Sequence, residues 1–337
     1  MSVLVIGNFG YVNNQLDGQT IKTRTIYKSV SELEGKFSFY DVGNKNKLIS
    51  MMLIFIMSFK YKDIYFLPGI RQLIFVSPLL FFVRMLKRSR IHYIVVGGWV
   101  TSLNSKYIKT ILGLFDSISV ELPSMVKPLK VINPKTYVLE NYRITDVSSR
   151  DLGVVKNQNL RLVYFSRVMK EKGIFDAINV SISLENTGVH HSLIIHGPIC
   201  FLSEDDATKF NELVDSHNHI KYKGTLSPDD IKKSLEEYHV LLFPTSYEGE
   251  GYPGCIVDAK MAGLTIFCTD WKYNGEIVNN GVDGYVIPSE KYVNKTTDIL
   301  TELHANRDEL LKLMHFSHIS SSRYAEDAFL TWRDTIR

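Results

Sequence analysis

The stretch VLLFPTSYEGEGYPGCIVDA, residues 240–259, decides how this 337-residue chain is organised. Its first four residues are apolar and predict a short buried strand, and a glycine-rich loop follows. The loop holds Glu248 and Glu250 and leads into a helical pattern that contains Asp258. Glycines let a backbone approach a ligand closely, and the N–H groups at a helix start favour an anion or a hydroxyl-rich ligand. Carboxylates also accept hydrogen bonds from sugar hydroxyls, although solvated glutamates in an ordinary loop would give the same pattern.

A second segment, YFSRVMKEKG at residues 164–173, carries two cations after another apolar run. Arg167 follows the predicted strand, and Lys172 precedes a predicted helix. Such a pair suits a diphosphate, because Arg binds it as a fork and Lys as a point charge. A solvated basic turn is the alternative interpretation.

Around these two segments, short apolar runs alternate with helical patterns along the whole chain. This alternation predicts βαβ units, a parallel sheet and an α/β fold. The expected strands are 3–6, 37–42, 64–67, 93–96, 162–166, 193–196, 240–243 and 265–267. A polar stretch at 145–151 is the expected linker between two doubly wound domains, with the cleft between them as the expected site.

Charge is divided unevenly along the chain. Residues 1–150 carry 20 Lys and Arg against 9 Asp and Glu, a net of +11, and the remainder carries −8. The first part is therefore expected to meet something anionic. No nucleic-acid motif accompanies the basic residues, so nucleic acid is not expected as a partner. The run 81–90, FFVRMLKRSR, has the composition of an interfacial membrane segment, but a core helix with a basic turn fits it equally well.

Other features narrow the class of protein. The three cysteines include no CxxC pair, which argues against a disulfide scaffold or a cysteine zinc site. The chain contains no D-x-D triplet and no cluster of metal-ligand spacing, so neither a metal nor another cofactor is expected. The apolar runs 48–59 and 73–83, the second interrupted by Pro78, are too short to span a bilayer. We expect a cytoplasmic protein.

Four motifs in the second half resemble those of retaining GT-B glycosyltransferases, close to glycosyltransferase family 4. Glu250 with Asp258 is similar to the E-x7-E motif, with Asp in place of the second Glu. Residues 166–173 resemble the G-R-L-x-x-x-K-G loop, residues 220–231 the F-x-G-x-l-s-x-x-e-l segment, and residues 274–284 the E-I-V-x-x-G-x-x-G tail. The first half corresponds less closely, through a glycine loop at 8–20 and residues 138–142. The end of the chain resembles the helix that returns to the first GT-B domain.

The resemblance implies a GT-B fold with two Rossmann-like domains, residues 1–148 with 322–337 for the acceptor and 149–321 for the donor. Arg167 and Lys172 would hold the diphosphate of a nucleotide-sugar, and Glu250 would contact its sugar. Donor-binding positions would be Gly251, Tyr252, Pro253, Gly254, Asp258, Lys223 and Gly18. Residues 95–99 occupy the place where the family often has a catalytic His, so none is assigned.

The implied activity is retaining transfer of a hexose, from a UDP-sugar, to a saccharide on a lipid such as undecaprenyl diphosphate. The implied role is bacterial O-antigen, capsule or exopolysaccharide synthesis, peripherally on the inner face of an anionic cell membrane. Three alternatives stay open: a GDP-sugar donor, a nucleotide-sugar 2-epimerase of the same fold, and a non-catalytic membrane-associated subunit.

Overall fold

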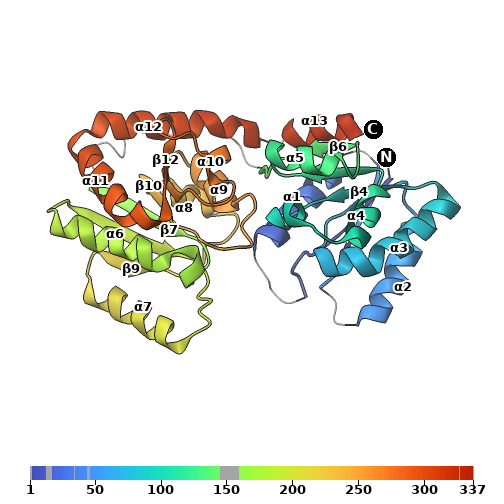
Figure 1. Cartoon of the computed structure of the whole chain (residues 1–337), viewed down its shortest axis with the longest axis horizontal. Coiled ribbons are helices and arrows are strands. Elements are labelled where there is room, and N and C mark those ends of the chain that lie inside the picture. Colours follow the sequence, from blue (N-terminus) through green and yellow to red (C-terminus); the bar gives the residue numbers. More distant parts are fainter. Residues whose placement is uncertain are drawn as a thin grey trace. The chain divides into compact units, whose positions relative to one another are not determined.

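The computed structural model of the protein describes residues 2–12, 17–33, 35–43, 46–144, 159–325 and 327–336 (Figure 1). The chain divides into two compact units, Met1–Asp146 with Tyr324–Arg337, called unit 1, and Val147–Arg323, called unit 2. The expected linker at 145–151 lies outside the described residues. Each unit contains one six-stranded sheet whose paired strands are all parallel. The predicted α/β fold with two parallel sheets is thus confirmed.

Unit 1 is built on a sheet of order β2-β1-β3-β4-β5-β6. Its strands are β1 (Ser2–Gly7), β2 (Lys36–Asp41), β3 (Asp63–Phe66), β4 (Arg90–Ile94), β5 (Ser117–Val120) and β6 (Thr136–Val138). Its helices are α1 (Gly18–Ser31), α2 (Lys47–Ser58), α3 (Ile70–Lys87), α4 (Lys106–Gly113), α5 (Pro123–Lys130) and α13 (Asp327–Ile336). Pro78 interrupts the apolar run in the sequence but does not end the helix, because α3 continues through it.

The last helix belongs to the core of unit 1. Phe329 and Trp332 of α13 are buried against Val3, Val5 and Tyr65 of the sheet. The indole N–H of Trp332 donates a 2.7 Å hydrogen bond to the hydroxyl of Ser119. A buried indole usually finds such a partner, because an unpaired N–H is costly away from water. The C-terminal helix is therefore an integral part of this unit.

Unit 2 is built on a sheet of order β12-β11-β10-β7-β8-β9. Its strands are β7 (Leu160–Phe165), β8 (His191–His196), β9 (Ile220–Tyr222), β10 (Val240–Phe243), β11 (Thr265–Thr269) and β12 (Gly284–Ile287). Its helices are α6 (Ile174–Asn186), α7 (Glu204–Ser216), α8 (Ile231–Leu235), α9 (Gly254–Met261), α10 (Asn274–Ile277), α11 (Tyr292–Ala305) and α12 (Arg307–Ser320). This is the doubly wound order, whose direction reverses between β7 and β10.

Four histidines of unit 2 make its stability depend on pH. Burial lowers the pKa of His191, His196, His219 and His304 below the ordinary value. The unfolded chain binds protons at these positions near pH 6.5, whereas the folded chain binds them only at lower pH. We therefore expect the melting temperature to fall as the pH drops from about 7.5 to about 5.5.

The variant His191→Gln should show a smaller loss of melting temperature over this range, whatever its stability at neutral pH. His315→Gln, at an exposed position of α12, is the control and should follow the wild-type slope. Equal slopes for all three proteins in differential scanning calorimetry would contradict the assignment.

Candidate active site

The strongest cluster of sequence-predicted site residues lies at the carboxyl ends of β7 and β10, where the strand order of unit 2 reverses. Neighbouring parallel strands in this position send their following loops in opposite directions, which opens a crevice for ligands. The loop after β7 brings Arg167 and Lys172 to this edge, and the loop after β10 brings Glu250. The two motifs therefore meet although 78 residues separate Lys172 from Glu250.

Lys172 and Glu250 form a buried ion pair. The Lys172 ammonium donates a 2.6 Å hydrogen bond to Oε2 of Glu250, and the two side chains are 9% and 7% exposed. The hydroxyl of Thr245 donates a second hydrogen bond, of 2.9 Å, to the same oxygen. Among the described residues, no recorded hydrogen bond reaches the other oxygen, Oε1. Buried carboxylates cost free energy unless they are paired, so this pair fixes both side chains in one place.

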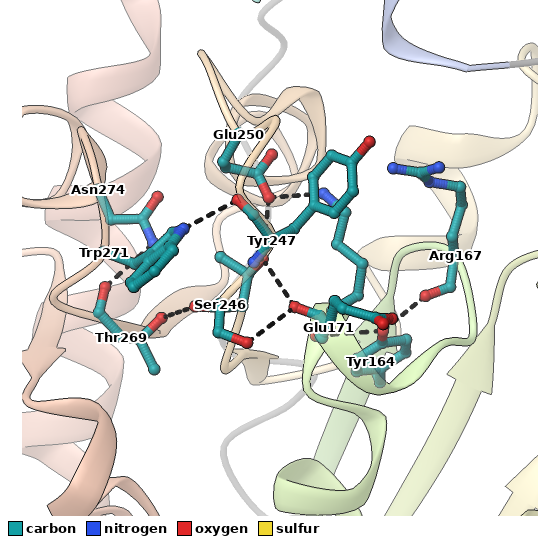
Figure 2. A network of polar contacts seen from close by, with 11 residues as sticks. Tyr164, Arg167, Glu171, Ser246, Tyr247, Glu250, Thr269, Trp271 and Asn274 are labelled. Atoms are coloured by element: carbon teal, nitrogen blue, oxygen red, sulfur yellow. Dashed lines mark hydrogen bonds and ion pairs between the residues drawn. The ribbon is translucent and has the colours of Figure 1, made fainter. Parts of the chain in front are cut away.

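Arg167 lies beside this pair and faces the ring of Tyr247 (Figure 2). Its guanidinium carbon is 4.8 Å from the ring centre, and the Lys172 ammonium is 4.9 Å from the same ring. Cations at such distances are attracted to the negative face of an aromatic ring. Within the described ranges, the Arg167 guanidinium has no recorded hydrogen bond or ion pair, and its residue is only half-buried. The site thus offers one guanidinium with its donors open to a ligand.

Backbone and hydroxyl contacts hold the two loops together. The Ser246 N–H donates a 2.8 Å bond to the carbonyl of Glu171, and the indole of Trp271 donates a 2.9 Å bond to the carbonyl of Tyr247 (Figure 2). The hydroxyl of Tyr164 lies 2.7 Å from the carbonyl of Arg167. Burial raises the pKa of this Tyr164 hydroxyl, so it remains a donor at neutral pH.

Gly173 allows the loops to approach this closely. Its φ of +78° lies in the left-handed region, and a Cβ there would overlap the backbone of Pro244. Only glycine suits both conditions without strain. The glycine after Lys172 therefore has a structural role: it allows the start of α6 to pack against the end of β10.

The helix α9 starts directly after the glutamate loop. Pro253 is its N-cap, Gly254 is its first residue, and Gly251 and Tyr252 are buried just before it. Asp258 lies in the second turn and is 8% exposed. Burial is the main reason why the pKa of the Cys255 thiol is raised. The thiol therefore stays protonated at neutral pH and is not a nucleophile.

Two further predicted donor residues lie on other elements. Lys223 is exposed and follows β9, the edge strand two places from β7, where it raises the positive charge around His196. Gly18 is the exposed first residue of α1 in unit 1. Glu248, the rival first acid of the motif, is 78% exposed and forms a 2.8 Å ion pair with Lys272.

Several residues of the cluster were not predicted from the sequence. Thr245 and Tyr247 contact the predicted residues, and Trp271 holds the Tyr247 carbonyl, yet nothing in their own spacing indicated this. In unit 1, a buried ion pair between Lys22 and Glu121, 2.8 Å long, was missed as well. The other Glu121 oxygen accepts a bond from the Gly97 N–H, so the pair fixes the loop after β4.

In the described part of the chain, no group of three or more His, Cys, Asp or Glu side chains could hold a metal ion. The same part contains no helix with the length and apolar character needed to cross a bilayer.

Comparison with known proteins identifies the class of enzyme to which this site belongs. Residues 148–314 match the model of the family described as Glycosyl transferases group 1. This match covers the sheet of unit 2 and both loops of the candidate site. The protein is a glycosyltransferase with the two-sheet α/β fold called GT-B.

Several solved structures share this fold. Anabaena HepE in complex with UDP has a TM-score of 0.75 at 13% identity, over 100% of this chain and 99% of that one. Sucrose-phosphate synthase from Thermosynechococcus elongatus has a TM-score of 0.73 at 12% identity, over 99% and 98%. The pneumococcal O-GlcNAc transferase GtfA, in complex with UDP and GlcNAc, has a TM-score of 0.65 at 15% identity, over 84% and 59%. No curated protein matches the chain.

The buried ion pair of Lys172 and Glu250 should show strong thermodynamic coupling. We expect Lys172→Met and Glu250→Gln each to lower the free energy of unfolding by on the order of 3 kcal/mol, because each leaves a buried polar partner unpaired. The double variant should lose less than the sum, by about 1–3 kcal/mol, in urea denaturation.

The control is the exposed ion pair of Lys272 and Glu248, which is 2.8 Å long. The cycle of Lys272→Met and Glu248→Gln should give a coupling below about 1 kcal/mol. Equal coupling in both cycles would show that burial adds nothing to the pair of Lys172 and Glu250.

Proposed function

We propose that the protein is a retaining hexosyltransferase that uses a nucleotide-sugar, with UDP as the nucleotide. Its acceptor in this proposal is a saccharide linked to a lipid diphosphate such as undecaprenyl diphosphate. The pathway is synthesis of a bacterial surface polysaccharide, such as O-antigen, capsule or exopolysaccharide. Retention of the anomeric configuration and the pathway follow from the family resemblance of the four sequence motifs.

The observation that carries the proposal is the pair of cations at the strand switch of unit 2. The Arg167 guanidinium has no recorded hydrogen bond within the described residues, and it can bind two phosphate oxygens as a fork. The Lys172 ammonium uses one of its three donors on Glu250, which leaves two for a ligand. The two groups share the Tyr247 ring, so both can reach one diphosphate.

The acidic residues of the site suit the rest of a nucleotide-sugar. Oε1 of Glu250 is an acceptor for a sugar hydroxyl, while Oε2 stays bound to Lys172 and Thr245. The backbone of 251–254 at the start of α9 supports the sugar or the diphosphate, with Tyr252 and Pro253 shaping the loop. Asp258 would hold the ribose. Lys223, which follows β9 of the same unit, completes the proposed donor contacts.

In the proposed reaction, negative charge grows on the diphosphate as the sugar leaves. Glu250 holds Lys172 in place before the reaction, so Lys172 stabilises this charge with little reorganisation, and Arg167, which lies against the Tyr247 ring, adds a second positive charge. We therefore propose that no metal ion and no other cofactor are needed. Turnover that is insensitive to EDTA would agree with this role of the two cations.

Different observations support the proposed nucleotide and the proposed acceptor. UDP is favoured because HepE and the pneumococcal O-GlcNAc transferase, which share this fold, are described in complex with UDP. A lipid-linked acceptor is favoured by the net charge of +11 in residues 1–150, which suits an anionic surface. In this proposal the protein lies peripherally on the inner face of the cell membrane.

We expect Arg167→Ala and Glu250→Ala to lower the turnover of the UDP-sugar by about a hundredfold, because each removes a group that contacts the donor during the reaction. Turnover is measured as release of UDP. The matched controls are Arg161→Ala, at the other end of β7, and Glu248→Ala, two residues before Glu250. Wild-type turnover in the Arg167 and Glu250 variants would refute the site assignment.

A thermal-shift panel of UDP, GDP, ADP and CMP identifies the nucleotide, since a ligand of the folded state raises the melting temperature. We expect a shift with UDP alone. A shift with GDP alone would replace the donor by a GDP-sugar. An epimerised donor as product would indicate a 2-epimerase, and no shift with any nucleotide would favour a non-catalytic subunit.

Gly249 provides a test of the Tyr247 ring. A Cβ at this position would lie 2.6 Å from Cε1 of Tyr247, so Gly249→Ala must displace the ring from the two cations. We expect UDP to bind about three- to fivefold more weakly in calorimetry, which corresponds to the loss of one exposed cation–π contact. Gly69→Ala controls for the substitution itself, because the φ of Gly69 is −68° and a Cβ there would meet only ordinary contacts, the nearest at 3.9 Å. Tyr247→Phe should bind UDP like the wild type.

A further inference from the structure

The helix α2 has its apolar and polar faces reversed. Its buried residues are Ser50, Ile54 and Ser58, which lie four residues apart on one face. Its outer face carries Leu48, Ile49, Met52, Leu53 and Ile56, which are 80%, 46%, 56%, 37% and 46% exposed. A helix on the surface of a globular unit normally turns its apolar face inward. Folding of unit 1 therefore does not explain the apolar face of α2.

The helix α3 extends the same apolar surface. It buries one apolar face in unit 1 and exposes Ile70, Phe75, Phe82, Met85 and Leu86. The two helices pack side by side (Figure 1), and the rings of Phe55 and Phe82 stack with their centres 6.3 Å apart. The exposed apolar side chains thus come from two adjoining helices. Surfaces of this kind mark contact with a membrane or another protein.

The charge around this surface is almost entirely positive. Residues 47–90 carry eight Lys and Arg against a single acid, Asp63. Asp63 is buried in an ion pair with Arg90. The exposed basic residues are Lys47, Lys60, Lys62, Arg71, Lys87 and Arg88. An apolar surface bordered by cations matches the interface of an anionic bilayer, with acyl chains below a layer of negative headgroups.

We propose that α2 and α3 form a membrane-insertion surface, with their outer apolar side chains below the anionic headgroups and the basic residues among them. A second copy of the chain is a poorer occupant, since a symmetric contact would bring two such positive surfaces together. This inference deepens the membrane association proposed above by assigning its surface. It does not depend on the donor site, which lies in unit 2.

The test uses the full-length protein and sedimentation with vesicles of phosphatidylcholine, with or without phosphatidylglycerol. Wild type should bind the mixed vesicles and not phosphatidylcholine alone. Leu48→Glu with Met52→Glu should weaken this binding by at least about tenfold, because two carboxylates would enter the interface. The control, Val131→Glu with Leu202→Glu, adds the same charge at positions that are 88% and 91% exposed and outside the surface. It should bind like the wild type.

Three results separate the possibilities. Wild-type vesicle binding by Leu48→Glu with Met52→Glu would overturn the proposal. The proposal would also be overturned, in favour of a contact between copies, by a second result. In that result the wild type is a dimer in light scattering, the variant is a monomer, and neither protein binds vesicles. The thermal shift with UDP, measured on the same proteins, should be equal in all of them; its absence in the wild type would refute the donor proposal and leave the vesicle result standing.

Discussion

The ion pair between Lys172 and Glu250 joins two loops that follow neighbouring strands, β7 and β10, at the point where the strand order reverses. A buried pair of this kind is a poor source of stability, because desolvation offsets most of the attraction. What it provides is position: one ammonium and one carboxylate are held by each other and by Thr245. The remaining contacts of the site depend on the same approach of the two loops, which the positive φ of Gly173 permits.

A second buried pair fixes the other end of the same region. Lys260, two residues after Asp258 on α9, donates 2.7 Å and 2.8 Å hydrogen bonds to Asp283 and to the carbonyl of Ile277. Asp283 in turn accepts bonds from the backbone and the side chain of Asn279. The segment 274–284, which resembles the family's tail motif, therefore supports α9 through side-chain bonds. The helix that starts at the glutamate loop is held at both ends.

The sequence predicted most of the strands that form the two sheets, because runs such as 240–243 are continuously apolar and bounded by glycine or proline. It missed β5, β6, β9 and β12, which have only three or four residues; the first three include Ser, Thr or Lys, and β12 begins with a glycine. It grouped Arg167, Lys172 and Glu250 through the family resemblance of their motifs, and the structure gives the physical reason: they follow adjacent parallel strands, whose carboxyl ends share one edge. It could not find Thr245, Tyr247 or Trp271, since their roles depend on side-chain directions that only the packed loops define. No comparable constraint of strand order links Lys223 or Gly18 to the ion pair.

The apolar run at 48–59 shows a different limit of sequence reasoning. A core helix and a membrane-facing helix can have the same composition, and only the packed structure shows which side meets the sheet. In α2 that side carries two serines and one isoleucine, so the larger apolar area points outward. The charge of the chain fits this division: the part that contains α2 and α3 has a net charge of +11, and the remainder has −8. An anionic surface attracts the first and repels the second, so electrostatics alone would favour contact through the face that carries the exposed apolar side chains.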